Sequence, residues 1–240
     1  MNWISYNIDD INSKYLYKFL SEENLKKFLD TGNIWFSRSD KFGDRMECVM
    51  IKDLIKSPPD FKEIEARKRR HLISCFHEGN IETLAFWDTY AKTDKDRRKY
   101  ALRFNREDLI KMLILNKQAL TSLSSISRLV HGRVRYLNLI GASNKKLESK
   151  TVSYTAFRKE YVFAYEREYR FDITLKNETN NLGVNINIGN PNDIDFVIHV
   201  NPLLESEDYI DCIKRIDQKG FKIKFEESTL AKWLKPELWK

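Results

Sequence analysis

One stretch of sequence, YEREYR at Tyr165–Arg170, indicates most about the fold of this 240-residue chain. Charged and aromatic residues alternate there, which is typical of a strand, because successive side chains of a strand point to opposite faces. We therefore predict a strand over about 165–174 that carries Glu166, Glu168 and Arg170 on one face. The opposite, mainly apolar face is suited to packing and would carry Phe163, Tyr165, Arg167, Tyr169, Phe171 and Ile173.

Arg167 is the anomaly of the packed face. A buried guanidinium without a charged partner is costly, so we expect Arg167 to pair with the carboxylate of Asp44 or Glu47. The two acids could instead contact a ligand, but an ion pair that fixes the loop over 38–45 is the interpretation we favour.

The first fifty residues predict a strand, a short helix and a second strand. The apolar stretch at 15–19 precedes Ser21, a typical N-cap, and Gly32 supplies the helix stop. The second strand covers 34–37 and runs into the polar loop.

The remaining elements follow no regular strand–helix alternation, which favours an α+β fold of mixed, mainly antiparallel sheets with flanking helices. We expect a single domain over 1–240, with a helical insertion at about 46–70 and a C-terminal strand–helix–strand unit at about 195–226. Further helices are predicted at 81–91, 105–117, 153–162 and 205–218, and further strands at 72–76, 100–104, 134–137, 183–188, 195–200 and 221–225.

Composition excludes several classes of protein. With 42% hydrophobic and 32% charged residues, the chain is typical of a soluble globular protein. No apolar run is long enough to cross a membrane and no secretory signal pattern is present, so we expect a cytoplasmic protein with no membrane contact. We expect neither metal sites nor disulfides, because the cysteines and histidines are not spaced as in the usual metal-binding or disulfide motifs. These residues are Cys48, Cys75, Cys212, His71, His77, His131 and His199.

The formal charge of +7 is gathered in clusters, which would attract phosphates. The most basic cluster lies in the helix predicted over 60–70, and others lie at 95–99, 128–135 and 145–146. A solvated face is the simpler interpretation of any one cluster. The alternative is binding to DNA or RNA through Arg67, Lys68, Arg69 and Arg70.

A set of short phrases, in order along about 15–225, resembles an uncharacterised bacterial and phage family known as domain of unknown function 2971. The chain departs from the family pattern at Gly43 and Arg45, where the family has Asn and Pro, and at Phe163, where it has Trp. The family name implies no activity. The matching phrases are Leu16-Tyr17-Lys18-Phe19, Ile34-Trp35-Phe36-Ser37, Phe42-Gly43-Asp44 with Glu47, Cys75-Phe76, Trp87 with Tyr90-Ala91, Val134-Arg135-Tyr136, and Tyr165–Arg170.

More distantly, the opening strand, helix and aromatic strand ending in Ser37-Arg38-Ser39 resemble the start of ADP-ribosyltransferase folds. That resemblance implies a split sheet with NAD, as substrate, in a cleft between its halves. It also implies that a glutamate of a Glu-x-Glu pair carries catalysis, here Glu168 with Glu166 assisting.

The residue types suit such a reaction. One carboxylate would stabilise positive charge developing on the ribose and a second would orient or deprotonate the acceptor. We expect Tyr17 and Trp35 to stack on the nicotinamide or the base, and the resemblance implies that the Ser37 hydroxyl lies near the nicotinamide. The pyrophosphate would be held by a guanidinium from Arg38, Arg45 or Arg170.

The leading hypothesis is thus an NAD-dependent ADP-ribosyltransferase-like enzyme or NAD glycohydrolase, acting as a toxin or in bacteria–phage conflict, with a partner protein or antitoxin. The competing hypothesis is a non-catalytic basic module that binds nucleic acid while the Glu-x-Glu strand is structural. A weaker third hypothesis is a metal-dependent nuclease, based on Pro59-Asp60 and Glu65-Ala66-Arg67-Lys68. The last segment has a helical pattern where that motif needs a strand.

Overall fold

The computed structural model describes residues 2–8, 12–44, 46–49, 60–91, 99–115, 120, 123, 125–138 and 154–239. The chain forms two compact units, each assembled from separate segments. The first unit comprises Met1–Ile11, Ile34–Cys75 and Ile114–Ile186, and the second comprises Asn12–Asn33, Phe76–Leu113 and Asn187–Lys240. Compact units of this kind occur within one domain as well as in separate domains, so the single domain stays a prediction.

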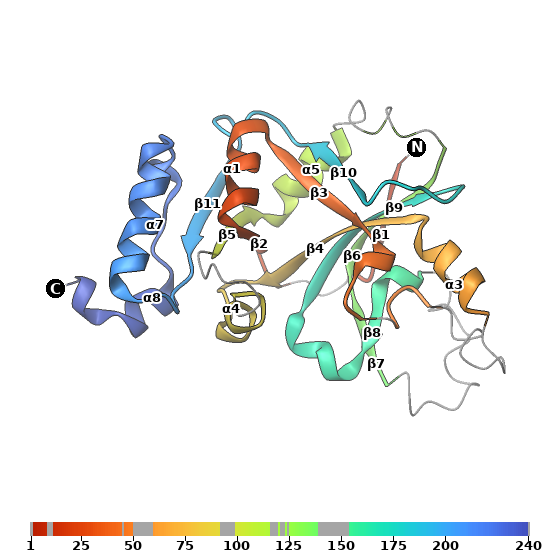
Figure 1. Cartoon of the computed structure of the whole chain (residues 1–240), viewed down its shortest axis with the longest axis horizontal. Coiled ribbons are helices and arrows are strands. Elements are labelled where there is room, and N and C mark those ends of the chain that lie inside the picture. The colour runs from red at the N-terminus through yellow and green to blue at the C-terminus, as the bar shows by residue number, and fades with distance from the viewer. Residues whose placement is uncertain are drawn as a thin grey trace. The chain divides into compact units, whose positions relative to one another are not determined.

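The first unit contains a mixed sheet with the strand order β1-β6-β9-β4, in which β3 pairs with β4 and β10 with β3. The pairing of β1 with β6 is parallel, whereas β6 with β9 and β3 with β4 are antiparallel. Figure 1 shows β1, β6 and β9 side by side. The bounds are β1 Trp3–Tyr6, β3 Asn33–Arg38, β4 His71–Gly79, β6 Ile126–Arg133, β9 Glu168–Leu175 and β10 Gly183–Asn187.

Short elements complete the first unit. The helix α3 spans Phe61–Lys68, and two residues separate it from β4. A small parallel pair, β7 (Arg135–Leu137) with β8 (Arg158–Glu160), stands apart from the main sheet. The 3₁₀ turns are η1 at Ser39–Lys41, η2 at Thr155–Phe157 and η3 at Tyr161–Glu166. Buried apolar residues include Ile73, Val130 and Phe157.

The second unit is an antiparallel sheet that includes the last four residues of β4. In it β2 (Tyr15–Ser21) pairs with both β4 and β5 (Lys99–Asn105), and β5 pairs with β11 (Phe196–Val200). The long helix α7 contacts β11 (Figure 1). The helical elements are α1 Glu22–Thr31, α4 Leu84–Ala91, α5 Arg106–Leu115, α7 Ser206–Gln218, η4 Lys222–Lys224, α8 Thr229–Leu234 and η5 Pro236–Trp239.

The predicted α+β class is confirmed, and local sequence signals explain the clearest element. The Ser21 side chain accepts a hydrogen bond from the backbone N–H of Asn24, and Gly32 adopts a left-handed conformation with φ 67°. The Gly32 N–H then donates to the carbonyl of Phe28 at 2.7 Å. Both predicted ends of α1 are therefore confirmed. No helix within the described ranges is long and apolar enough to cross a membrane.

Two predicted elements are wrong. In place of the strand predicted at 221–225, residues Lys222–Lys224 form the 3₁₀ turn η4, with hydrogen bonds from Lys224 N to Phe221 O and from Phe225 N to Lys222 O, both 2.9 Å. Ile223 is 92% exposed, so the alternating pattern there does not reflect a buried face. Within the helix predicted at 153–162, the described residues 154–162 form η2, β8 and the start of η3 in place of an α-helix.

The insertion predicted at 46–70 is described only in part. Residues 46–48 form a turn and α3 is helical as expected, whereas 50–59 lie outside the described residues. Arg45 and the basic clusters at 95–98 and 145–146 lie outside them as well.

Candidate functional site

The predicted catalytic pair, Glu166 and Glu168, is buried and holds a lysine between its carboxylates. The two side chains are 5% and 4% exposed. Lys159 Nζ, from β8, lies 3.1 Å from Glu168 Oε1 and also contacts Glu166 Oε2. The ammonium group additionally lies 4.7 Å from the ring centre of Phe163. Glu166 and Glu168 are thus brought together by a cation that the sequence reasoning did not include, and Glu166 lies in η3 rather than on the predicted strand.

Arg170 and Glu47 also contact the charged side chains of Glu168 and Lys159. Arg170 is fully buried; its Nε contacts Glu168 Oε2 and its Nη1 donates to the carbonyl of Ala156 at 2.8 Å. Its Nη2 lies 2.9 Å from Glu47 Oε2, while Glu47 Oε1 lies 3.0 Å from Lys159 Nζ. We call Glu47, Lys159, Glu166, Glu168 and Arg170 the buried ion cluster.

One shared proton makes the buried ion cluster electrically neutral. Burial, with the hydrogen bond and the negative charge of Glu168, raises the pKa of Glu166 to about 8. Burial also opposes ionisation of Glu168, but the charges of Arg170 and Lys159 outweigh it and lower the Glu168 pKa well below its usual range. Near neutral pH the pair therefore holds one proton between its two carboxyl groups. The two negative charges that remain on the three carboxyl groups then balance Lys159 and Arg170.

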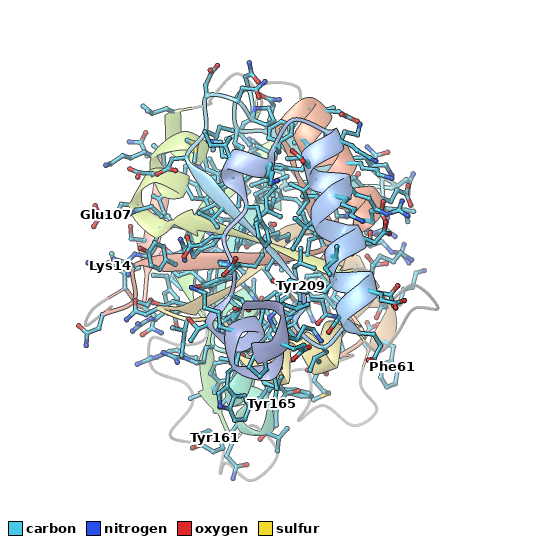
Figure 2. All side chains as sticks on the ribbon, turned by 90° about the vertical axis from the view of Figure 1, so that its left-hand side faces the viewer. Lys14, Phe61, Glu107, Tyr161, Tyr165 and Tyr209 are labelled. Atoms are coloured by element: carbon cyan, nitrogen blue, oxygen red, sulfur yellow. The ribbon has the colours of Figure 1, made fainter. Side chains whose placement is uncertain are left out.

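Arg167 does not lie on the packed face. It follows η3, adopts a left-handed conformation with φ 43°, and is exposed. The strand begins only at Glu168, so Tyr165 is also turned outward and is 47% exposed; Figure 2 shows it with Tyr161 at the surface. The expected partner Glu47 binds Lys159 and Arg170 instead, and the Asp44 side chain accepts from the backbone N–H of Met46. The predicted Arg167 ion pair is therefore wrong.

The residues expected to hold NAD belong partly to the first unit and partly to the second. Tyr17 belongs to the second unit and is 2% exposed, whereas Trp35 and Ser37 lie on β3 of the first unit, with Trp35 45% exposed. The guanidinium of Arg38 is occupied by Asp40, at 3.0 Å between Nη2 and Oδ2, and by the carbonyl of Thr179 at 2.8 Å. Of the two predicted phosphate-binding arginines that the structure describes, Arg38 and Arg170, only Arg170 contacts Glu168.

A second feature of the first unit is a pocket with a basic lining. It lies where the segment after α3 meets the ends of β6 and β9. We call it the basic pocket, and it is lined by Cys48, Arg67, Arg70, His71, Ser127, Arg128, Thr155, Thr174, Leu175 and Lys176.

Three cations of the basic pocket have no counter-charge within the described part of the chain. Arg70, Arg128 and Lys176 form no ion pair there, and the Nε atoms of both arginines are buried without a hydrogen-bond partner. Arg128 is held in place by the Tyr154 ring, whose centre lies 4.8 Å from the guanidinium carbon. The pocket therefore carries an uncompensated positive charge.

The four predicted nucleic-acid residues separate into two pairs. Arg67 and Arg70 line the basic pocket, although Arg67 also pairs with Glu63. Lys68 is buried, with Glu65 at 3.9 Å, and Arg69 pairs with Glu178 at 3.6 Å. Only Arg67 and Arg70 of the four thus line the pocket.

A histidine–aspartate pair also borders the basic pocket. His71 Nδ1 lies 3.1 and 3.0 Å from the two oxygens of Asp172, a residue of β9 that is 1% exposed. Asp172 Oδ2 also accepts from Thr174 Oγ1 at 2.9 Å. Cys48, by contrast, is inert, because burial raises the pKa of its thiol to about 12.

Sequence reasoning missed Lys159, Lys176 and the His71–Asp172 pair as site residues. One signal was present: the alternation that begins at Glu168 continues through Arg170, Asp172 and Thr174, which marks one long polar face of a buried strand. Lys159 carried no such signal, because it lies in a short strand that the pattern assigned to a helix.

Comparisons with family models, curated proteins and solved structures give no match to this chain. No group of His, Cys, Asp or Glu able to hold a metal is found in the described ranges, where Asp60 caps α3 through the N–H of Glu63 and Glu65 lies in that helix. The resemblances to domain of unknown function 2971 and to ADP-ribosyltransferases stay predictions.

Proposed function

We propose that this protein is a nucleic-acid-binding module that holds phosphate groups in the basic pocket. One observation carries the proposal: Arg70, Arg128 and Lys176 converge on one concavity without a carboxylate partner among the described residues. Like charges gathered in this way repel one another, and an anion relieves that repulsion.

Phosphate fits the donors that are present. A guanidinium offers paired N–H donors that match two phosphate oxygens, and a lysine adds a point charge. The buried, unsatisfied Nε atoms of Arg70 and Arg128 are further donors that an oxyanion could use. Nucleic acid is the phosphate source that we commit to, because the net charge of +7 also favours long-range attraction to a polyanion.

The experiment measures binding of labelled DNA and RNA, single- and double-stranded, by fluorescence anisotropy over a range of salt concentrations. We expect tight binding at low salt and a steep salt dependence, because phosphate contacts release counterions. The double variant R70A/R128A should bind at least about tenfold more weakly, with a salt slope smaller by about two.

Arg69→Ala is the matched control. It removes the same charge one residue from Arg70, but Arg69 is paired with Glu178 and does not line the pocket. Its affinity should stay close to that of the wild type. Affinity that ignores salt, or an equal loss in R69A and R70A, would refute the proposal.

The ADP-ribosyltransferase hypothesis is a second candidate, favoured by one observation. Glu166 and Glu168 are pushed toward different protonation states, which is a common arrangement for an acid and a base in catalysis. We rank it second because both side chains are buried and their oxygens are engaged by Lys159 and Arg170. Incubation with labelled NAD tests this hypothesis. We expect the wild type, but not Glu168→Gln, to release nicotinamide, and no release by the wild type would refute the hypothesis.

A further inference from the structure

The basic pocket contains a group that phosphate binding alone does not require. Both oxygens of Asp172 lie within 3.1 Å of His71 Nδ1. A carboxylate in that position fixes the tautomer in which Nδ1 carries the proton and Nε2 presents its lone pair. His71 Nε2 makes no hydrogen bond with any residue that the structure describes, and His71 lines the pocket.

The His71–Asp172 pair is held in position by the sheet and by a neighbouring hydroxyl. Asp172 is 1% exposed on β9, next to β4 in the sheet, and Thr174 Oγ1 donates to Asp172 Oδ2 at 2.9 Å. His71 is the first residue of β4 and directly follows Arg70, so the imidazole and an uncompensated guanidinium come from adjacent residues. The sheet therefore places the His71 imidazole next to a cation of the basic pocket.

Other nucleophiles and bases of the pocket are less suited to proton transfer. The Cys48 thiol stays protonated because of its burial, and the hydroxyls of Ser127 and Thr155 are weak bases. Imidazole is the side chain that ordinarily exchanges protons near neutral pH.

We propose that the basic pocket cleaves RNA by an internal transesterification in which His71 is the general base. The proposal rests on the proposed binding of nucleic acid. His71 Nε2 accepts the proton of a ribose 2′-hydroxyl, and the 2′-oxygen forms a bond to the adjacent phosphorus. The bond from phosphorus to the 5′-oxygen breaks, and that oxygen takes a proton from the Lys176 ammonium group.

The step is balanced without any co-reactant. One proton moves to His71 and one leaves Lys176, and both residues exchange with solvent before the next cycle. The products are a 2′,3′-cyclic phosphate end and a 5′-hydroxyl end. The non-bridging oxygens of the phosphate carry the negative charge that develops in the transition state, and Arg70 and Arg128 would stabilise it. Asp172 is a positioning residue, because it acts through His71.

The test offers the protein a labelled RNA oligonucleotide in the presence of a metal chelator. We expect cleavage into fragments with cyclic phosphate ends, identified by their mass. An oligonucleotide of the same sequence with 2′-O-methyl groups should be bound but not cleaved, because it lacks the proton that His71 accepts.

The variant H71Q should lose about a hundredfold or more in rate, with affinity for the 2′-O-methyl RNA within about twofold of wild type. Should H71Q fold poorly, H71G with added imidazole is the second variant, and added imidazole should restore part of the rate. A purely structural histidine would show neither the split between rate and affinity nor the rescue. R69A, prepared identically, should cleave like wild type.

The outcomes separate the two proposals. Binding of RNA without cleavage, equal cleavage by H71Q, or cleavage of the 2′-O-methyl RNA overturns the catalytic proposal and leaves phosphate binding intact. Absence of any nucleic-acid binding overturns both.

Discussion

The guanidinium of Arg170 lies 2.9 Å from the carboxylate of Glu47, and both side chains are almost completely shielded from solvent. This contact joins β9 to the turn at 46–48, where the neighbouring residue Cys48 packs in the apolar core with Ile73 and Val130. The buried ion cluster thus adds charged contacts to apolar packing at this place in the first unit.

Replacing Arg170 by Ala should destabilise the protein by about 3–5 kcal/mol, because it leaves Glu47 and Glu168 buried without their cation. Urea unfolding followed by tryptophan fluorescence measures the change. Arg167→Ala is the matched control, because Arg167 is exposed three residues away; it should change the free energy of unfolding by no more than about 0.5 kcal/mol. Equal effects of the two substitutions would contradict the assignment of Arg170 to a buried cluster.

Glu166→Gln should flatten the pH dependence of stability between about pH 5 and 8. In the folded protein the Glu166 pKa is raised to about 8, so the folded state holds a proton that the unfolded state has lost over this range. Stability contributed by this proton is present at the acidic end and is lost as pH rises toward 8. Glutamine does not titrate, so the variant lacks this contribution. Unfolding of the wild type and the variant at several pH values gives the slope of the free energy of unfolding against pH for each protein. A wild-type slope retained by the variant would show that another group is responsible.

His131 should make the protein less stable as the pH falls, which is the opposite of the effect expected for Glu166. Burial lowers its pKa to about 4, and the imidazole is bonded to Tyr169 and Ser5 at 2.6 and 3.1 Å. The unfolded state binds the proton first, so stability should fall as pH drops from about 6.5 toward 4. In H131Q this part of the acid transition should be smaller. Proton NMR of the histidine ring provides the independent check, and a normal titration midpoint would disprove the assignment.

Gly32→Ala should be strongly destabilising at the end of α1. The residue has a φ of 67°, and an added Cβ would lie 1.7 Å from the carbonyl oxygen of Gly189. The conformational cost alone is about 1–2 kcal/mol, and the clash adds to it. Gly43→Ala is the control, because nothing lies within 4 Å of its Cβ position and its φ is ordinary. Thermal unfolding of the two variants should therefore differ by several degrees, and similar midpoints would contradict the prediction.

Elements with local causes were predictable from the sequence. Ser21 and Gly32 bound α1 through hydrogen bonds within a few residues, so their signals need no knowledge of the rest of the chain. The α+β class followed from the same kind of pattern. The two units did not, because each is assembled from segments that are distant in the sequence.

The site was harder to predict because its cations come from different elements. Period-two alternation placed Arg167 on a packed face, but the chain turns at Arg167 and restarts the pattern at Glu168. Lys159, which contacts the two glutamates, lies in β8, and no local signal indicates the pairing of β8 with β7. Arg70 could be proposed from its basic run, whereas the absence of a counter-charge is a tertiary property.

The strand β9 separates two electrical environments. At its first residues the charges of Glu168 and Arg170 are cancelled within the buried ion cluster, so they contribute little to the potential outside it. At its last residues Thr174 and Leu175 border cations that nothing described neutralises. A polyanion approaching the first unit would therefore be drawn to one end of this strand and scarcely influenced by the other, although both ends are rich in ionisable side chains.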